Sequence, residues 1–425
     1  MPRTARSSMS LFFLIALLPA LALPLPRSAE ATDVPSSSNG EIFERVDTLS
    51  LGSPGNLVVT ALMAPDGSHA YLGTSYNPGQ IVKVDLDTFE RVGDLTLATG
   101  DNAPKSAVIS PDGLHAYYGV DSLTGRVVKV DLTTFTRAGA ITLPSDEGLL
   151  RAATISPDGS HAYFATTGIN AASKIVKVDL VEFERVGSIT LASAERNVRA
   201  AVMAPDGLHA YFGTATSPGR IVKVDLTTFT RVGAITLESG ENRVECAVIA
   251  PDGSHAYFGT ANGGVVKVNL ATFERVGAAP MGTGEDFLAS AAIEPDGSHA
   301  YFGNETNPAH IVKLDLGTFT RTGGIELAWG EQNLQTAMMA PDGNHVYFAT
   351  NSSPNPDKLI KVQIRPILEI DEEARAVGDF NEDGCTDFAD FLFLLENWGV
   401  DFGGTPIGFG DFLALLEHWG DGPDC

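Results

Sequence analysis

A Pro-Asp-Gly turn recurs seven times along this chain, and a histidine stands two residues after each turn glycine. The intervals between turns are 46, 46, 48, 46, 44 and 46 residues. A period in the forties with about four short β-strands per unit is typical of a propeller blade, which buries its apolar faces by stacking on its neighbours. The repeat predicts an all-β fold, a seven-bladed β-propeller. The turn prolines are Pro65, Pro111, Pro157, Pro205, Pro251, Pro295 and Pro341.

The fourth unit shows the strand pattern of one blade. Residues 200–204 are small and apolar, the turn follows, and residues 209–214 are rich in aromatic side chains. In residues 221–226 polar and apolar side chains alternate, so that Lys223 lies on one face and the valines on the other. A fourth strand within residues 227–237 ends the unit. No part of the repeats has a convincing helical period.

A Phe-x-Arg-like element of the fourth strand also occurs seven times, but its copies are offset by one unit from the seven Pro-Asp-Gly turns. The first copy, at Phe43, precedes any complete unit, and the last unit ends at residues 359–362 without a copy. We therefore expect residues 43–51 to complete the seventh blade beside the C-terminal strand, since this closure pairs edges that would otherwise be exposed. The propeller is expected to span residues 42–364.

Three segments of the second unit carry a resemblance to a known family. Residues 109–117 read Ile-Ser-Pro-Asp-Gly-Leu-His-Ala-Tyr, residues 127–131 read Val-Val-Lys-Val-Asp, and a Thr-Arg-x-Gly-x-Ile-Thr strand closes the unit. These segments resemble the YVTN-type β-propeller repeats of exported bacterial proteins, and the resemblance covers residues 42–364. It implies the fold and almost nothing about function.

Composition and the N-terminus predict export. The 425 residues include 53 acidic and 28 basic side chains, a formal charge of −25, which disfavours nucleic acid and anionic membranes as partners. Arg3 and Arg6 precede an apolar run at residues 11–23 and a cleavage-like site at residues 29–31, so residues 1–31 are predicted to be a signal peptide. No other segment approaches the ~18 apolar residues that span a bilayer. We expect a secreted protein, extracellular or at the cell surface, with no membrane span.

An acidic loop follows a linker predicted at residues 365–377. Side-chain oxygens occupy positions 1, 3, 5, 9 and 12 of a twelve-residue loop, and Gly384 occupies position 6. This spacing surrounds one Ca²⁺ with six or seven oxygen ligands. The predicted ligands are the side chains of Asp379, Asn381, Asp383, Asp387 and Asp390 and the carbonyl oxygen of Cys385.

The segment after this loop is repeated. Residues 388–399 match residues 409–420 at an offset of 21, and apolar side chains at helical spacing predict a helix in each copy. Paired loop–helix units resemble type I dockerin modules. The resemblance implies a small α-helical, EF-hand-like module at residues 378–425 that docks on a cohesin-like or cell-surface protein. The second loop, residues 400–410, lacks the ligand side chains, so one Ca²⁺ is expected.

The three cysteines fit an exported protein. Cys246 occupies a first-strand position that holds threonine, serine or alanine in the other units, so it is expected to be a buried small side chain. Cys385 and Cys425 bracket the C-terminal module. We expect a disulfide between them, because small exported modules commonly need such a link.

Seven histidines and seven lysines repeat with the blades. Residues related by the repeat and lying off the axis cannot converge on one ion, so we interpret both sets as scaffold, the histidines bonding the turn or a neighbouring strand. They are His69, His115, His161, His209, His255, His299 and His345, and Lys83, Lys129, Lys177, Lys223, Lys267, Lys313 and Lys361.

The repeats differ near the blade-joining loops. An acidic residue stands ten positions before each later turn proline, and the position four residues further, predicted to lie near the axis, varies. An acidic ring at a channel mouth would attract cations or basic ligands; alternatively, the acids cap turns and pair with Arg126, Arg220 or Lys174. The acids are Asp101, Glu147, Glu195, Glu241, Glu285 and Glu331, and the near-axis residues are Lys105, Arg151, Arg199, Glu245, Ala289 and Gln335.

A catalytic site needs dissimilar groups that converge at one point. The sequence shows no Ser/His/Asp triad, cysteine nucleophile or histidine metal spacing, and its blades are nearly interchangeable. We therefore expect a non-enzymatic binding or scaffold protein with a protein or glycan ligand on the propeller face, attached through its C-terminal module. The alternative is a propeller hydrolase or lyase, similar to seven-bladed lactonases or degrading a polysaccharide.

Overall fold

The computed structural model describes residues 41–52, 57–168, 172–262, 264–352 and 356–366, together with residues 391, 401–402, 405–406, 412 and 414. The chain divides into two units, Met1–Pro35 and Ser36–Cys425, and every described residue belongs to the second. The predicted signal peptide lies outside the described residues. Among the described residues, no helix is long and apolar enough to cross a membrane.

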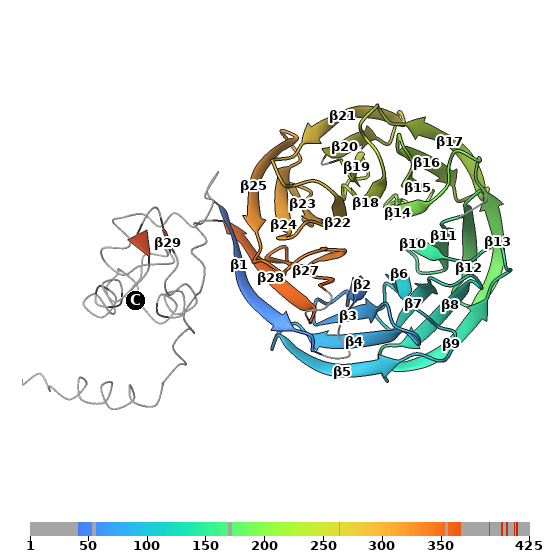
Figure 1. Ribbon diagram of the computed structural model, residues 1–425, viewed down its shortest axis with the longest axis horizontal. Helices are drawn as coiled ribbons and strands as arrows, with labels where there is room; N and C mark the ends of the chain where they lie inside the picture. The colour runs from blue at the N-terminus through green and yellow to red at the C-terminus, as the bar shows by residue number, and fades with distance from the viewer. Residues whose placement is uncertain are drawn as a thin grey trace, which may run out of the picture. The chain divides into compact units, whose positions relative to one another are not determined.

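Seven four-stranded antiparallel sheets surround a central axis and form a seven-bladed propeller (Figure 1). In each blade the strands follow one another from the axis outward. The first three blades are β2 (Val58–Met63), β3 (His69–Thr74), β4 (Gln80–Asp85) and β5 (Glu90–Thr96); β6 (Pro104–Ile109), β7 (His115–Val120), β8 (Arg126–Asp131) and β9 (Thr136–Thr142); and β10 (Leu150–Ile155), β11 (His161–Thr166), β12 (Lys174–Asp179) and β13 (Glu184–Thr190).

The next three blades have the same order of strands. They are β14 (Val198–Met203), β15 (His209–Thr214), β16 (Arg220–Asp225) and β17 (Thr230–Thr236); β18 (Val244–Ile249), β19 (His255–Thr260), β20 (Gly264–Asn269) and β21 (Glu274–Pro280); and β22 (Leu288–Ile293), β23 (His299–Asn304), β24 (His310–Asp315) and β25 (Thr320–Glu326).

The seventh blade joins the two ends of the propeller, which confirms the predicted closure. Its strands, from the axis outward, are β26 (Thr336–Met339), β27 (His345–Ala349), β28 (Lys358–Pro366) and β1 (Glu41–Ser50). In the register of β1 and β28, Phe43 lies opposite Ile364. Strand β28 continues to Pro366, two residues beyond the predicted propeller boundary at residue 364.

Buried polar contacts reinforce this closure. The carboxylate of Asp357 accepts hydrogen bonds from the backbone N–H groups of Val58 and Ser352, each at 2.6 Å. The N–H of Leu51 donates to the carbonyl oxygen of Asp357 at 2.9 Å. One buried side chain therefore connects the strand that opens the first blade to the loop before β28.

The Pro-Asp-Gly turns pack on one another around the ring. Gly67 has a φ of +77°, and a Cβ built on it would lie 3.0 Å from Cδ of Pro341 in the neighbouring blade. Likewise, a Cβ on Gly113 would lie 3.2 Å from Cδ of Pro65. Glycine is therefore required for two reasons: the backbone is left-handed, and the neighbouring proline leaves no room for a Cβ atom. The same contact recurs at Gly159, Gly207, Gly253, Gly297 and Gly343.

The apolar core lies between adjacent blades. In one cluster, Tyr211 and Ile221 of the fourth blade pack with Phe258 and Val266 of the fifth, and all four side chains are buried. Equivalent clusters occur around the ring. The second and third strands of each blade are covered on both faces by the neighbouring blades. This burial explains why the second strand of the repeat is rich in aromatic residues and the third in valine.

Few residues of the C-terminal region are described. Phe391, Phe412 and Ala414 have helical backbone, and β29 (Asp401–Phe402) pairs with β30 (Thr405–Pro406). The dockerin-like module predicted at residues 378–425 otherwise lies outside the described residues, and its α-helical fold stays a prediction.

Candidate functional site

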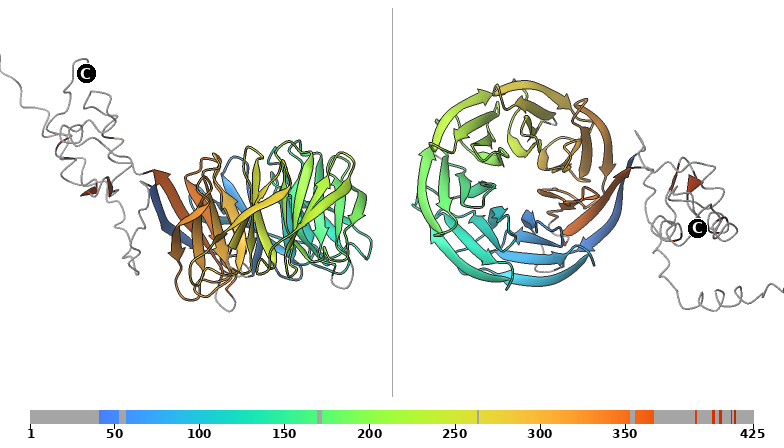
Figure 2. Two further views of the ribbon diagram at one scale, coloured as in Figure 1. Left: turned by 90° about the horizontal axis from the view of Figure 1, so that it is seen from above. Right: turned by 180° about the vertical axis from the view of Figure 1, so that it is seen from behind.

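The left view of Figure 2 shows the propeller edge-on. Two sets of loops lie on the same one of its two faces. The loop that joins the first two blades contacts the loop between β3 and β4: Gly79 N–H donates to the carbonyl of Asp101 at 2.8 Å, and Ala103 N–H donates to the carbonyl of Tyr76 at 3.0 Å. We call this face, formed by the blade-joining loops, the joining face. The Pro-Asp-Gly turns lie at the other end of the inner strands.

Five of the six acidic residues of the joining loops are buried rather than open to a channel, and the sixth, Glu241, is partly buried. The Glu147 side chain is 1% exposed, and Arg185 Nε and Ser188 Oγ each donate to it at 2.7 Å. Each acid meets the arginine of a Phe-x-Arg element in an outermost strand. The pairs are Asp101–Arg137, Glu147–Arg185, Glu195–Arg231, Glu241–Arg275, Glu285–Arg321 and Glu331–Arg45.

Of the partners expected from sequence, Arg126 lies 3.1 Å from Asp101, whereas Lys174 pairs with Asp146 and Arg220 donates to Thr236. The predicted turn capping is present, since Ala192 N–H donates to Glu195 at 3.1 Å.

The ionised state of Glu147 fits this scaffold role. Burial alone would raise the pKa of Glu147, but hydrogen bonds from Arg185 and Ser188 outweigh it and hold the pKa below its ordinary value. The carboxylate already has strong donors in the protein, so it is not available to collect cations at a channel mouth. The acidic ring is therefore part of the scaffold.

The innermost strands present three layers of side chains to the axis, because alternate residues of a strand point to the same side. The first axial layer, nearest the joining face, differs from blade to blade, the second is alanine throughout, and the third is methionine or isoleucine. From first to third, the layers are Val59, Lys105, Arg151, Arg199, Glu245, Ala289 and Gln335; Ala61, Ala107, Ala153, Ala201, Ala247, Ala291 and Ala337; and Met63, Ile109, Ile155, Met203, Ile249, Ile293 and Met339.

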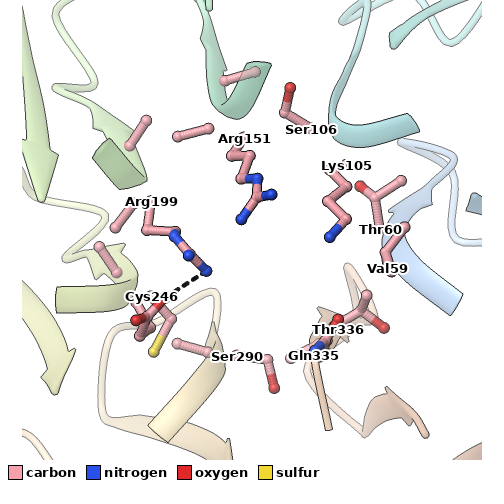
Figure 3. Close-up of a pocket in the computed structure, with 18 of the residues that line it drawn as sticks. Val59, Thr60, Lys105, Ser106, Arg151, Arg199, Cys246, Ser290, Gln335 and Thr336 are labelled. Carbon is pink, nitrogen blue, oxygen red and sulfur yellow. Dashed lines mark hydrogen bonds and ion pairs between the residues drawn. The ribbon is translucent and has the colours of Figure 1, made fainter. Parts of the chain in front are cut away.

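A cavity of about 220 Å³ lies on the axis, and all residues of the first two layers except Ala289 and Ala107 line it (Figure 3). Lys105, Arg151 and Arg199 come from consecutive blades and extend into the same space, as Figure 3 shows. Glu245 and Gln335 complete the polar wall. Three cations and one carboxylate therefore surround the cavity, although the protein as a whole has a formal charge of −25. The near-axis prediction for these residues is confirmed.

Two carboxylates hold the cationic side chains in place. Asp121, directly after β7, accepts from Arg151 at 3.0 Å (Nε) and 2.8 Å (Nη2), and Lys105 Nζ lies 3.5 Å from the same carboxylate. Glu245 accepts from Arg199 Nη1 at 3.3 Å and from Arg243 Nε at 3.0 Å. Each carboxylate thus serves two cations, which leaves positive charge at the cavity wall. Sequence reasoning did not single out Asp121.

The pKa values of the cavity residues reflect partial exclusion of water. Burial, followed by the positive charge of Arg151, lowers the pKa of Lys105, although Asp121 acts in the opposite direction. Burial raises the pKa of Glu245 despite the nearby guanidinium groups of Arg199 and Arg243. Charges in such a site interact more strongly than on an open surface, because the local dielectric constant is lower.

Among the described residues, four of the seven repeated histidines contact the serine of their turn, which agrees with the scaffold interpretation. Ser68 Oγ and His69 Nδ1 are 2.7 Å apart, and His69 Nε2 lies 4.0 Å from Asp85, its partner in the register of β3 and β4. The serine–histidine contact recurs at His161, His255 and His299.

The repeated lysines lie between blades. Lys83 Nζ is 5.8 Å from the ring centroid of Tyr71 and 5.9 Å from that of Phe135 in the next blade. The equivalent lysine of every blade lies over two rings in the same way. Cation–π attraction therefore joins adjacent blades, and the lysines belong to the scaffold. Cys246 is buried with a free thiol, as expected.

A polar cluster in the sixth blade departs from the repeat. Glu294 Oε2 is 3.0 Å from His299 Nδ1, and Tyr301 and Ser298 also donate to this carboxylate. Burial would raise the pKa of Glu294, but these hydrogen bonds lower it to about 2. A sequence signal existed, because the equivalent positions hold only alanine or serine: Ala64, Ser110, Ser156, Ala204, Ala250 and Ala340.

The predicted calcium site and disulfide lie outside the described residues. This applies to every predicted ligand from Asp379 to Asp390 and to the Cys385–Cys425 pair, which stay predictions. Within the part of the chain that the structure describes, no group of three or more His, Cys, Asp or Glu side chains could hold a metal ion.

The fold has relatives among solved structures, whereas no protein-family profile and no curated protein matches the sequence. Kuenenia stuttgartiensis hydrazine synthase is similar with a TM-score of 0.61 and 18% identity, over 75% of this chain and 97% of that one. The Myceliophteria thermophila Cps50 (Swd1) β-propeller domain is similar with a TM-score of 0.60 and 14% identity, over 74% and 99%. These likenesses support the propeller fold alone.

Proposed function

We propose that this chain is an exported, non-enzymatic binding and scaffold protein that binds its ligand on the joining face. The observation that carries the proposal is the first axial layer. The seven blades share their turns, core clusters and lysine contacts, and they diverge where the side chains meet on the axis. A scaffold does not need such divergence, whereas a binding site requires unlike groups around one ligand.

The cavity chemistry favours binding over catalysis. Ser106 Oγ donates to the carbonyl of Leu150 at 3.2 Å, and Ser290 Oγ donates to the carbonyl of Leu334 at 2.6 Å. In the described residues neither hydroxyl contacts a histidine or carboxylate that could act as its base. Lys105, Arg151 and Arg199 supply donors and positive charge, which suit recognition.

Attachment would occur through the C-terminal region. The twelve-residue acidic loop and the repeated helical segment support a dockerin-like module with one Ca²⁺, whose partner would be a cohesin-like or cell-surface protein. The N-terminal pattern of residues 1–31 supports export. In this arrangement the module fixes the protein to a surface or assembly, and the propeller presents its joining face to a protein or glycan ligand.

Glycan and peptide arrays with the full chain in Ca²⁺ test the proposal. Variants Arg151→Gln at the cavity and Trp329→Ser on an exposed joining-face loop are compared with Leu208→Ser on the opposite face, where most other blades already have serine. A ligand weakened by a joining-face variant and retained by Leu208→Ser is expected. A ligand that only Leu208→Ser weakens contradicts the assignment, as would turnover of lactones or glycans that Glu245→Gln abolishes.

A further inference from the structure

We propose that the axial cavity binds a small oxyanion, a carboxylate, sulfate or phosphate group, between Lys105, Arg151 and Arg199. This inference rests on the proposed function and names the chemistry of its ligand. Phosphate and carboxylate oxygens are recognised by arginine through paired N–H donors and by lysine as a point charge. Both kinds of donor lie on adjacent blades around one cavity.

The cations have donors left over after their protein contacts. Arg151 uses Nε and Nη2 on Asp121, and Arg199 uses Nε on Asn197 and Nη1 on Glu245. Among the described residues, Nη1 of Arg151 and Nη2 of Arg199 have no hydrogen-bond acceptor. Arg151 is therefore held by the edge that carries Nε and Nη2, and one terminal nitrogen of each arginine remains available to a ligand oxygen.

The charge of the wall is not balanced inside the cavity. Asp121 holds two of the cations but is not part of the lining, so the lining itself contains Lys105, Arg151 and Arg199 against Glu245. An anion here removes the mutual repulsion that burial has intensified. The overall negative charge of the protein opposes this only weakly, because salt screens distant charges beyond about 8 Å.

The alanine layer sets the size of the ligand. Seven axis-facing alanines leave space that larger side chains would fill, and the resulting cavity of about 220 Å³ is below the ~300–1,000 Å³ of pockets for drug-sized ligands. It therefore fits a free oxyanion or one charged group of a larger molecule.

Calorimetry and thermal unfolding of the full chain with sodium phosphate, sulfate or succinate, against chloride at equal ionic strength, test the inference. Parallel arms use glucuronate and glucose 6-phosphate, which separate a free anion from a group carried on a sugar. At least one oxyanion is expected to bind in the millimolar range or tighter and to raise the melting temperature. Because charged hydrogen bonds are lost, Arg151→Gln should weaken it about tenfold or more.

Two further variants keep the test decisive if Arg151→Gln unfolds. Ala201→Leu leaves every charge in place, fills the alanine layer and should abolish binding. Lys174→Gln, on the joining face but outside the cavity, should bind like the wild type. No binding of any oxyanion overturns the inference, and so does binding that Ala201→Leu leaves unchanged. If the arrays find a joining-face ligand that these anions do not displace, the proposed function stands and the oxyanion inference fails.

Discussion

Replacing Arg45 with alanine removes a buried ion pair that joins β1 to a loop 286 residues later in the chain. Arg45 donates to both oxygens of Glu331, from Nη1 at 2.8 Å and from Nη2 at 3.1 Å. The Glu331 side chain is 3% exposed, while that of Arg45 is 24% exposed. The pair therefore connects the N-terminal strand of the seventh blade to the loop that leads into its innermost strand.

The expected loss of stability lies between two limits. Breaking a fully buried pair costs about 3–5 kcal/mol, and exposed pairs contribute about 0–1 kcal/mol. Arg45 is partly exposed, and Glu331 retains Lys358 Nζ at 2.7 Å and Ala328 N–H at 3.1 Å. We therefore expect Arg45→Ala to lower the free energy of unfolding by about 2 kcal/mol. For a domain of this size the melting temperature should fall by about 3 °C.

The effect should depend on pH. Burial would raise the pKa of Glu331, but hydrogen bonds from Lys358 and Arg45 hold it below the ordinary value. A carboxylate with a lowered folded-state pKa stabilises the protein above its unfolded pKa of about 4.3, and this contribution is lost as pH falls through the folded value. The difference between wild type and Arg45→Ala should therefore be full at neutral pH and shrink in acid.

Denaturant unfolding of the full chain at neutral and acidic pH provides the assay. Arg91→Ala is the matched control, because Arg91 occupies the same place in the repeat but pairs with the more exposed Asp94 instead of a buried joining-loop acid. The control should lose less stability than Arg45→Ala. Equal losses for the two variants, or a difference that does not change with pH, would refute the buried-pair explanation.

Three other results are expected. Glu294→Ala should lower the free energy of unfolding at neutral pH. The folded-state pKa of Glu294, about 2, corresponds to a stabilisation on the order of 3 kcal/mol, which the wild type loses as pH falls from about 4.5 toward 2 and the variant lacks. A variant that loses stability in acid as the wild type does would contradict this. Calorimetry should give one Ca²⁺ per chain, lost in Asp383→Ala and retained in Asp401→Ala, and two equivalent sites or none would show that the loops are misread. Lys223→Met should cost about 1 kcal/mol in thermal unfolding because it removes a cation from between two blades, and no loss would exclude cation–π attraction there.

The blade architecture could be predicted because each repeat unit indicates both the strands within a blade and the packing of that blade on its neighbour. The Pro-Asp-Gly turn marks the strand pair and, through contacts such as Gly67 on Pro341, also the packing of adjacent blades. The shifted register of the element at Phe43 indicated closure, since each blade needs a fourth strand. The near-axis position of residues such as Arg151 followed from period-2 alternation in an inner strand.

The side-chain partners could not be predicted in the same way. Glu147 meets Arg185, which is 38 residues later, and the path of the intervening loops is not encoded in the period. Asp121 was not singled out because its position, at the start of a variable loop, has no constant chemistry in the repeat. The cavity was also hidden, because it depends on the alanine layer and on how long side chains fold toward the axis.

A crystal structure of the full chain with the oxyanion that stabilises it most would test the central claim, that the joining-face cavity is the ligand site. We expect the anion to lie on the axis within hydrogen-bond distance of Lys105, Arg151 and Arg199, above the alanine layer. An anion found only on the face of the Pro-Asp-Gly turns, or an empty cavity at a saturating concentration, would contradict the account.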